Sequence, residues 1–564
     1  MCLPRDDGYV SPVQGGLTRR RLLATGVAAV AATTNAATAL AGRVDALVAA
    51  ISGLTVRNAG RPYAGDRTLF ATVSPGVPGR ATARVGLTLP RPAVVTVQAV
   101  RTAPRSSKVA WSTRRRLAAG RHELAWTPAP GTPVGSYVMR VTIERGSAKK
   151  VLGGRRPASP EQSRAPVTRV LGVEASFRER SYVAGDAMAL RVFADASRLR
   201  LTFLRTGHGP DPSLRSDEIT GEPMGEPVPI GWAGKRSAPA TISVQAGATW
   251  PSGLYAARLE TGDGRVGFAP FVLRPAALGT SSRVAVVMPT NTWQAYNFYD
   301  ADGDGWGDTW YAGGAPAVAL DRPYRDRGVP PRFRRYDFPF LRWLQKRGHD
   351  PEFLSEEDVE TIGGDALRRA YDLVVFPGHT EYVTEREYDA VERFRDLGGR
   401  LVFLSANNFF WKVERRGREL RRVGLWRELG RPEARLLGVQ YRANDDGSRQ
   451  GVYYLVGADR VPWLFEGTGL GAESTLGDQV GGYGIEVDGI TEDSPEGTIL
   501  VGLVPSLFGP GLHGEMAYYE TDAGARVFSA GTLDFCSSLL VAPVTRMLDN
   551  LWWHMTSDVP TPAG

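Results

Sequence analysis

A short apolar run that ends at a Pro-Gly turn constrains the fold of this chain more than any other feature. Leu373 to Phe376 are consecutive apolar residues, which is typical of a strand buried on both faces. The run stops at Pro377-Gly378, and an acid-rich helical pattern follows from Glu385 to Leu397. A buried strand followed by a helix predicts an open α/β sheet, in which ligands bind at the carboxyl ends of the strands.

The same alternation extends over residues 280–558. Val284–Met288 and Leu401–Leu404 are further apolar strands, while Phe338–Gly348 and Val544–Met555 carry apolar residues at helical spacing. We therefore expect a doubly wound α/β domain. Class I glutamine amidotransferases carry a cysteine nucleophile in the turn after the strand that corresponds to residues 373–376 of this chain. In this chain the turn carries His379 instead. We expect an amidotransferase-like scaffold without acyl-enzyme chemistry.

Residues 1–41 have the features of an export signal. Thr18-Arg-Arg-Arg-Leu-Leu23 precedes an uncharged run of small and apolar residues, Ala24–Ala41, which is typical of a Tat signal peptide. The alternative, a membrane anchor, is disfavoured because the run contains Thr33, Thr34 and Asn35. We expect export by the Tat pathway to an extracellular, cell-wall-associated or periplasmic location, with no membrane span in the mature chain.

Two β-rich modules are expected before the α/β domain. Residues 52–150 show β-branched alternation between Pro and Gly turns, as in Ala93–Val100. Residues 151–167 form a basic linker rich in Pro and Ser, and residues 168–275 return to the β pattern. We expect two β-sandwiches of immunoglobulin-like type, and we expect no catalytic site in either.

Composition disfavours some classes of function. The formal net charge is +8 at pH 7, but arginine clusters such as Arg114–Arg116 are scattered and lack accompanying stacking aromatics. This pattern favours solvated protein surface over nucleic-acid binding. Cys2 lies in the leader, so Cys536 is left alone, which excludes an internal disulfide and a cysteine zinc cluster in the mature chain.

Polar residues follow three of the predicted strands at the same sheet edge. His379 and Glu381 follow the strand at 373–376, Asn407 follows the strand at 401–404, and Tyr296 follows the strand at 284–288. A histidine and a glutamate at a strand end suit metal binding or acid–base chemistry. The alternative is a hydrogen-bonded turn with a helix-capping glutamate, beside an aromatic packing loop.

An acidic, glycine-rich loop is a second candidate metal site. Asp300, Asp302, Asp304 and Asp308 stand at relative positions 1, 3, 5 and 9 of a calcium loop, with glycine at position 6. Position 12 is Tyr311 rather than glutamate, and no flanking helices are evident, so the loop is not an EF-hand. We expect a Ca²⁺ site of another kind, and the alternative is a solvated acidic turn.

Several motifs, in this order along the chain, resemble the large (beta) subunit of the N,N-dimethylformamidase family. They are Thr292–Asn297, Asp308–Tyr311, Asp321–Pro323, Phe340–Leu344, Gly378–Tyr382 and Ala406–Trp411. The resemblance covers roughly residues 280 to 555. It implies a mononuclear Fe(III) held by two tyrosinates and one glutamate, and activity on small amides.

The resemblance also implies roles for individual residues. The iron ligands would be Tyr296, Tyr311 and Glu381, with Tyr336 as the alternative to Tyr311. Hard anionic oxygen donors of this kind favour Fe(III).

Three more residues receive roles by the same resemblance. His379 and Asn407 would orient water or stabilise the oxyanion, and Glu486 would take or relay a proton. The family also implies a small partner subunit, so we expect either such a subunit or a homo-oligomer.

These expectations combine into one leading hypothesis and one alternative. The leading hypothesis is an exported, iron-dependent hydrolase that cleaves C–N bonds of small amides with metal-activated water. The alternative is an exported, non-catalytic protein that Ca²⁺ stabilises and that binds a glycan or a surface partner on the same amidotransferase-like scaffold.

Overall fold

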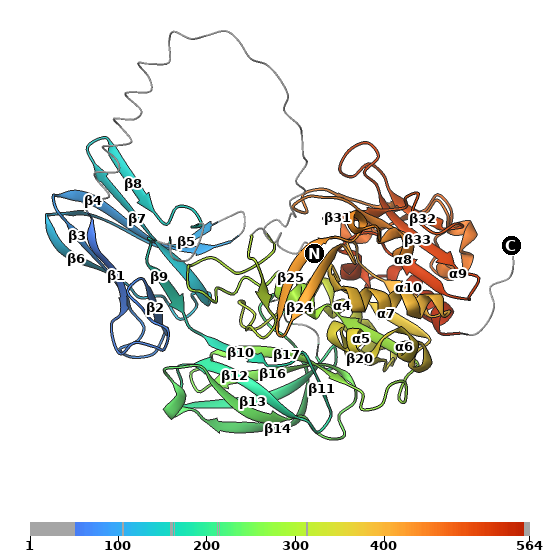
Figure 1. The fold of residues 1–564 in the computed structure, drawn as a ribbon, viewed down its shortest axis with the longest axis horizontal. Coiled ribbons are helices and arrows are strands. Elements are labelled where there is room, and N and C mark those ends of the chain that lie inside the picture. Colours follow the sequence, from blue (N-terminus) through green and yellow to red (C-terminus); the bar gives the residue numbers. More distant parts are fainter. Residues whose placement is uncertain are drawn as a thin grey trace, which may run out of the picture.

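The computed structural model describes residues 51–103, 107–157, 162, 164–210, 213, 215–311 and 314–557. Within these residues the chain is rich in β-structure and has three parts, two β modules and a larger sheet covered by helices (Figure 1). The expectation of a β-rich chain with several domains is confirmed. The expected signal segment, residues 1–41, lies outside the described residues. Among those residues, no helix is both long and apolar enough to cross a bilayer.

The first β module, residues 52–170, encloses one apolar core between two sheets. Its strands are β1 (Ser52–Asn58), β2 (Phe70–Val73), β3 (Ala83–Leu89), β4 (Ala93–Thr102), β5 (Ser107–Leu117), β6 (Gly120–Trp126), β7 (Gly135–Arg145), β8 (Ala148–Leu152) and β9 (Val167–Val170). The sheet orders are β1-β3-β6 and β2-β9-β7-β4-β5, with β8 paired to β7. Strand β9 follows the expected linker but pairs with β2 and β7, so it belongs to this module.

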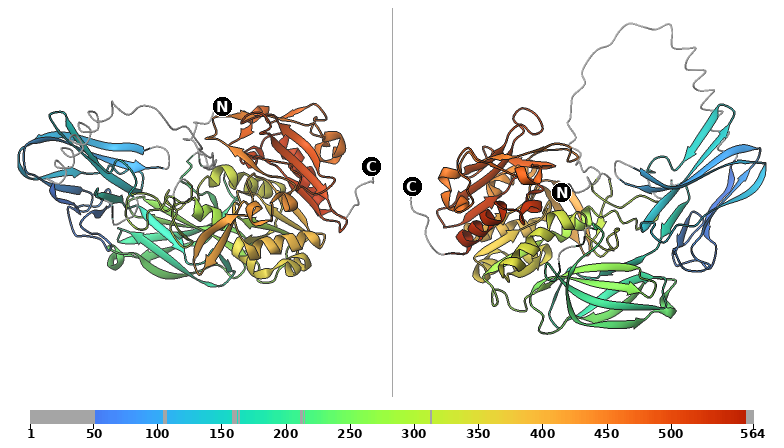
Figure 2. Two further views of the ribbon diagram at one scale, coloured as in Figure 1. Left: turned by 45° about the horizontal axis from the view of Figure 1, so that its top comes forward. Right: turned by 180° about the vertical axis from the view of Figure 1, so that it is seen from behind.

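The second β module, residues 173–274, has the same plan. Its strands are β10 (Val173–Phe177), β11 (Ser181–Val183), β12 (Ala187–Ala194), β13 (Arg198–Thr206), β14 (Gly221–Gly231), β15 (Ala240–Gln245), β16 (Gly253–Thr261) and β17 (Val266–Arg274). The sheets β10-β12-β15 and β11-β17-β16-β13-β14 share one buried core. Both modules lie as separate lobes beside the third part (Figure 2).

The third part, from Val284 onward, is built on a nine-stranded mixed sheet. In spatial order its strands are β20 (Glu352–Ser355), β18 (Val284–Met288), β21 (Leu373–Phe376), β23 (Arg400–Phe403), β34 (Arg526–Ser529), β33 (Gly514–Glu520), β32 (Ile499–Val504), β28 (Tyr453–Tyr454) and β29 (Thr475–Leu476). The first five strands are parallel. The remaining pairs are antiparallel.

Helices cover both faces of this sheet. Val284 and Val286 share a core with α4 (Phe338–Arg347) and α10 (Val544–Thr556). Ala285 and Val287 instead share a core with α5 (Glu356–Ile362), α6 (Gly364–Ala370) and α7 (Glu385–Asp396). Successive side chains of a strand point to opposite faces, so a strand covered on both sides must be apolar at every position. This is the physical reason for the continuous apolar run at Leu373–Phe376.

A smaller sheet lies beside the carboxyl ends of the parallel strands. Its strands are β19 (Val318–Ala319), β22 (Tyr382–Thr384), β24 (Trp411–Arg416) and β25 (Glu419–Leu425), in the order β19-β25-β24-β22. Strand β22 follows the turn after β21 and precedes α7, so the turn at 377–381 is held between two sheets. The remaining short elements are α2 (Thr290–Ala295), α3 (Phe333–Tyr336), α8 (Ala434–Leu437), α9 (Pro462–Phe465), β26 (Gln440–Asn444), β27 (Gln450–Gly451), β30 (Tyr483–Gly484) and β31 (Glu486–Gly489).

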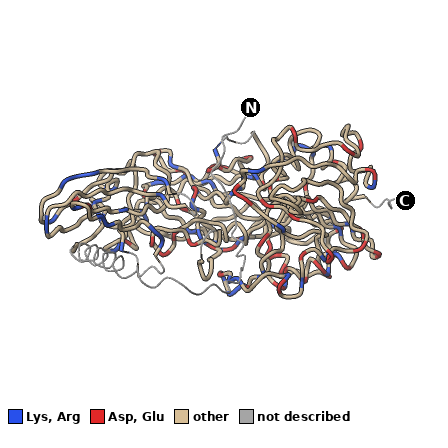
Figure 3. Tube along the Cα trace, turned by 90° about the horizontal axis from the view of Figure 1, so that it is seen from above, with Lys and Arg blue, Asp and Glu red and all other residues tan. Residues whose placement is uncertain are grey.

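Basic and acidic residues are interspersed along the whole trace (Figure 3). Arg114 pairs with Glu144 at 2.7 Å, and Arg415 pairs with Glu360 at 3.0 Å. Both arginines therefore have an acidic neighbour on the folded chain.

The packing of α4 against α10 gives a test of the core. Trp343 is fully buried, and its Nε1 donates a hydrogen bond to Asp549 Oδ1 at 3.0 Å. We expect Trp343→Ala to lower the free energy of unfolding by about 3–5 kcal/mol through a cavity and a lost hydrogen bond. The control is Trp553→Ala, because Trp553 is 59% exposed and its loss should change stability by less than about 0.5 kcal/mol. The midpoint of denaturant unfolding measures both, and equal shifts would contradict the assigned packing.

Candidate metal centre

Side chains from four segments meet at the carboxyl edge of the large sheet. Tyr296 follows α2, which continues directly from β18. His379 and Glu381 lie in the turn after β21, Asn407 follows β23, and Glu486 begins β31. Three of these segments follow β18, β21 and β23, which are neighbours in the large sheet, and Glu486 comes from the separate two-stranded sheet of β26 and β31.

The distances define a compact cluster around Glu381. The Tyr296 hydroxyl donates a short hydrogen bond to Glu381 Oε2. His379 Nε2 lies 3.6 Å from Glu381 Oε2 and 3.4 Å from Glu486 Oε2. Glu381 and Glu486 are completely buried, and Asn407 is 1% exposed.

Many polar atoms in this cluster are buried without a hydrogen-bond partner. They are His379 Nε2, Glu381 Oε1, both carboxyl oxygens of Glu486, both side-chain polar atoms of Asn407, and Tyr336 Oη. Folded proteins normally pair such atoms with protein groups or water. So many unpaired donors and acceptors in one place indicate a site built for a ligand.

Burial dominates the electrostatics of the cluster. It raises the pKa of Glu381 to about 8, against the opposing effect of the hydrogen bond from Tyr296. It raises the pKa of Glu486 well above the ordinary value, and the charge of Glu381 adds to this effect. It lowers the pKa of His379 to about 3, against a hydrogen bond with the Asn407 backbone. Buried carboxyls and a neutral imidazole together favour a cation that replaces the carboxyl protons.

The two tyrosines considered as second ligand both lie near this cluster. The rings of Tyr296 and Tyr311 are 5.5 Å apart. Tyr336 lines a small pocket together with Tyr296 and His379, and its buried hydroxyl oxygen has no hydrogen-bond partner. A third ring, Tyr382, lies 5.6 Å from Tyr296. Sequence reasoning missed Tyr382, and its position directly after Glu381 was the only available signal.

Thr292 is a further residue that sequence reasoning did not single out for a role. Its Oγ1 accepts hydrogen bonds from the backbone N–H groups of Glu381 at 3.0 Å and Tyr382 at 3.5 Å. Asn291 Nδ2 donates to the Tyr382 carbonyl at 3.2 Å. The start of α2 therefore holds the turn that carries Glu381, and a lone threonine in a sequence gives no sign of such a contact.

Asp488 fixes the backbone at Asn407. Both Asp488 carboxyl oxygens accept a hydrogen bond from the Asn407 backbone N–H, with N···O distances of 2.8 and 3.1 Å. Asn407 has φ +54°, a left-handed conformation that asparagine tolerates better than most residues. This conformation turns the strand end so that the Asn407 side chain lies at the cluster.

A small pocket opens beside the cluster. Its lining residues are Thr292, Trp293, Tyr296, Pro331, Arg332, Tyr336, Asp337 and His379. Trp293 and Pro331 give it apolar walls, while Tyr296 and His379 form its polar end.

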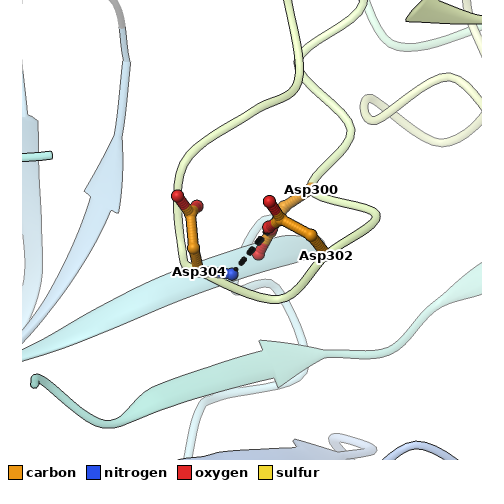
Figure 4. A group of neighbouring side chains, drawn as sticks. All are labelled: Asp300, Asp302 and Asp304. Carbon is orange, nitrogen blue, oxygen red and sulfur yellow. Dashed lines mark hydrogen bonds between the residues drawn. The ribbon is translucent and has the colours of Figure 1, made fainter. Parts of the chain in front are cut away.

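The acidic loop lies away from this pocket, between α2 and the first β module. Asp300, Asp302 and Asp304 each offer a carboxylate oxygen, and these oxygens lie within 4.8 Å of one another (Figure 4). Asp308 is outside this group, and its Oδ2 accepts from the Ala301 N–H at 2.8 Å. The structure thus brings together three of the four predicted calcium ligands, and Ca²⁺ itself stays a prediction.

Calcium binding to this loop should depend on pH. Burial raises the pKa of Asp300 to about 8 and of Asp304 to about 6, with Asp302 adding to the effect on Asp304. The folded chain therefore binds more protons than the unfolded chain, and the metal-free protein loses stability as pH rises from roughly 4 to roughly 8. Because Ca²⁺ competes with these protons, we expect it to raise the melting temperature more at pH 8 than at pH 5.

Thermal melts in Ca²⁺ and in chelator at the two pH values measure this effect. Asp302→Asn is the matched variant, because it removes a ligand charge and keeps the size of the side chain. A melting temperature at pH 8 that Ca²⁺ leaves unchanged would contradict the predicted site.

Comparison with known proteins places this architecture in a family. The model of the family described as "N,N-dimethylformamidase beta subunit-like, C-terminal" matches residues 232–549, more than half of the chain. The match begins at Trp232 in the second β module and includes every residue of the candidate metal centre.

Curated relatives carry the same description. The N,N-dimethylformamidase beta subunit of Paracoccus aminophilus is 24% identical over 284 residues, which is 40% of this chain and 37% of that protein. The protein of the same name from Alcaligenes sp gives the same identity and coverage. The chain thus spans little more than a third of the length of these relatives.

Two solved structures resemble the chain weakly. The Yersinia pseudotuberculosis adhesin InvE covers 40% of this chain and 59% of its own, with 12% identity and a TM-score of 0.13. A Salmonella alpha-2-macroglobulin mutant covers 39% of this chain and 16% of its own, with 8% identity and a TM-score of 0.20. These likenesses carry no argument about fold. By the extent of the family match, this chain belongs to the N,N-dimethylformamidase beta subunit-like family.

Proposed function

We propose that this chain is an exported, iron-dependent hydrolase of C–N bonds in small amides, with chemistry similar to that of N,N-dimethylformamidase. The observation that carries the proposal is the cluster of buried, unpaired oxygen and nitrogen atoms around Glu381. The relatives named N,N-dimethylformamidase beta subunit support the reaction class. The proposed scaffold is amidotransferase-like, and the two proposed N-terminal modules are immunoglobulin-like.

The residues present fit a ferric ion. Tyr296 and Glu381 offer anionic oxygens in contact with each other, and either Tyr311 or Tyr336 would complete the set. Hard oxygen donors suit a trivalent cation, which would supply the positive charge that these buried carboxyls now obtain from protons. When bound, such an ion polarises an amide carbonyl and lowers the pKa of water.

His379 is placed to hold and orient a water molecule through its Nε2. Its Nε2 has no hydrogen-bond partner, so the bond with the Asn407 backbone comes from Nδ1. That bond leaves the lone pair on Nε2, which faces Glu381 and Glu486. Glu486, whose oxygens are unpaired, then takes or relays the proton toward the leaving amine.

Asn407 is placed to stabilise the oxyanion. Its side chain is buried beside the carboxyls of Glu381 and Glu486, and Asp488 holds its backbone in the left-handed conformation. A preorganised donor of this kind costs nothing to orient when negative charge develops on the amide oxygen. The apolar walls formed by Trp293 and Pro331 suit the alkyl groups of a small amide.

The name of the relatives also supports an assembly. Both are called beta subunits, so we infer that this chain works with a partner subunit or as an oligomer. The twin-arginine segment supports export by the Tat pathway, to an extracellular, cell-wall-associated or periplasmic location. Ca²⁺ in the acidic loop is part of the same proposal.

The second candidate function is an exported, calcium-stabilised binding protein for a glycan or a surface partner. The grouping of Asp300, Asp302 and Asp304 is the observation that favours it. This protein would bind calcium and no iron, and it would leave small amides unchanged.

Metal content with the visible spectrum separates the two functions. Protein expressed with its own leader should carry about one iron per chain and the visible band of tyrosinate–Fe(III) charge transfer. Glu381→Ala should lose both, because it removes the carboxylate that binds the ion. Glu385→Gln is the control, since Glu385 is 59% exposed and pairs only at the surface with Lys412. A colourless wild type that holds calcium alone would favour the binding protein.

A second test addresses the role of His379. We expect His379→Gln to lower kcat on small amides by about 10²-fold, because the ring nitrogen that orients the attacking water is lost. Iron content and the visible band should stay unchanged, because His379 is not a proposed ligand. Release of free amine from a panel of small formamides and acetamides measures the rate. An unchanged kcat would remove His379 from the reaction, and a lost band would make it part of the metal site.

A further inference from the structure

The loop between Tyr296 and Tyr311 is held by the N-terminal β modules. The loop crosses from the end of α2 to the first β module and returns, and this segment lies between the two lobes in Figures 1 and 2. Among the side chains of these modules that bind it, we call four the loop clasp: Arg67, Thr102 and Arg169 of the first β module, and Glu174 of the second.

Arg169 makes the central contact of the loop clasp. Its Nη2 donates to the Asp300 carbonyl at 3.0 Å. Its guanidinium carbon lies 5.2 Å from the Phe70 ring and 5.4 Å from the Tyr299 ring. Its side chain is only 13% exposed, so these contacts form away from most of the solvent and are correspondingly strong.

The other members of the loop clasp bind on both sides of Asp300. The buried Thr102 hydroxyl donates to the Gly305 carbonyl at 2.7 Å. Glu174 Oε2 accepts from the Tyr299 hydroxyl at 2.9 Å, and Arg67 donates a short hydrogen bond to the Asp302 carbonyl. The arginines bind backbone carbonyls rather than the carboxylates of the loop, so the clasp sets the path of the chain itself.

Two glycines let the loop approach the first β module closely. A Cβ on Gly303 would lie 2.8 Å from the Phe70 ring, and one on Gly305 would lie 2.6 Å from Val138 Cγ2. Both glycines have left-handed backbones, with φ +75° and φ +88°. The module surface therefore fits this loop and leaves no space for a side chain at either point.

Hydrogen bonds connect the loop at 298–311 to the candidate metal centre. The Asp308 N–H donates to the Tyr299 carbonyl at 3.0 Å, and the Trp310 N–H donates to the Ala295 carbonyl at 2.8 Å. Thr309 Oγ1 donates to the same Ala295 carbonyl at 2.9 Å. These bonds place Tyr311 beside Tyr296, so the position of one ring relative to the other depends on the path of the loop.

We propose that the first β module is a structural part of the metal centre, and that Arg169 is a positioning residue which holds the loop so that Tyr311 faces Tyr296. The N-terminal modules would then help to shape the α/β domain, and they would not be independent binding units. The effect of Arg169 on a bound metal ion rests on the proposed function. Its effect on the stability of the loop at 298–311 can be measured in the metal-free protein.

Hydrogen exchange in the metal-free full chain tests the hold on the loop. We expect Arg169→Ala to raise the exchange rate of peptides covering residues 298–311 by about tenfold or more, because local opening then becomes easier. Peptides from β21 and β23 should exchange as in the wild type. Arg169→Lys should restore little, since an ammonium lacks the planar stacking face of a guanidinium.

Two further variants keep the test decisive. Thr102→Val removes one donor at nearly constant volume, and it should raise exchange of the same peptides even if Arg169→Ala folds poorly. Arg114→Ala is the matched control, because Arg114 lies on the same module with a side chain that is 65% exposed. Exchange of 298–311 that is unchanged in both Arg169→Ala and Thr102→Val would overturn the proposal.

The iron-loaded protein tests the link to the centre. We expect Arg169→Ala to weaken or shift the tyrosinate band, while Arg114→Ala leaves it unchanged. Faster exchange with an unaltered band would overturn the positioning role. A wild type that binds no iron would overturn the proposed function instead, and the exchange measurements would still decide whether the module holds the loop.

Discussion

The burial of Glu381 is the constraint on which the candidate centre depends. A carboxyl group without solvent is costly unless it is neutral, hydrogen-bonded or bound to a cation. Here the carboxyl group receives one short hydrogen bond from Tyr296 and leaves its second oxygen unpaired. Thr292 helps to hold Glu381 in this position, because its Oγ1 accepts a hydrogen bond from the Glu381 backbone N–H. The protein thus keeps a buried oxygen atom unpaired at the expense of some stability, which is common at functional sites.

Local patterns in the sequence predicted the central part of the fold well. The apolar runs of β18 and β21 have the expected bounds, and Ser355 and Asp358, three residues apart, form a capping box at the start of α5. These features depend on residues close together in the chain. The hairpin of β24 and β25 was not foreseen, because its charged strands carry no clear alternation of apolar residues and form beside a partner, β22, that is only three residues long.

The candidate centre was predictable as a set of residues but not as a geometry. The motif match pointed to Tyr296, Glu381, His379 and Asn407, and the structure brings them together. The contact of Thr292 with the Glu381 turn, the nearness of Tyr382, and the attachment of β9 to the first module all join segments far apart in the chain. The spacing of apolar residues along a sequence does not reveal contacts between distant segments. For the same reason the sequence alone left Tyr311 and Tyr336 as alternatives for the second tyrosine ligand.

The surface that receives the loop at 298–311 has a consequence for synthesis. Arg67, Phe70, Thr102 and Arg169 all precede this loop in the chain. Domains generally fold as units during translation, beginning with the N-terminal one. The first β module is therefore complete while the loop is still on the ribosome. The loop at 298–311, which lies beside the candidate metal centre, can then dock on a surface of the first β module that has already formed.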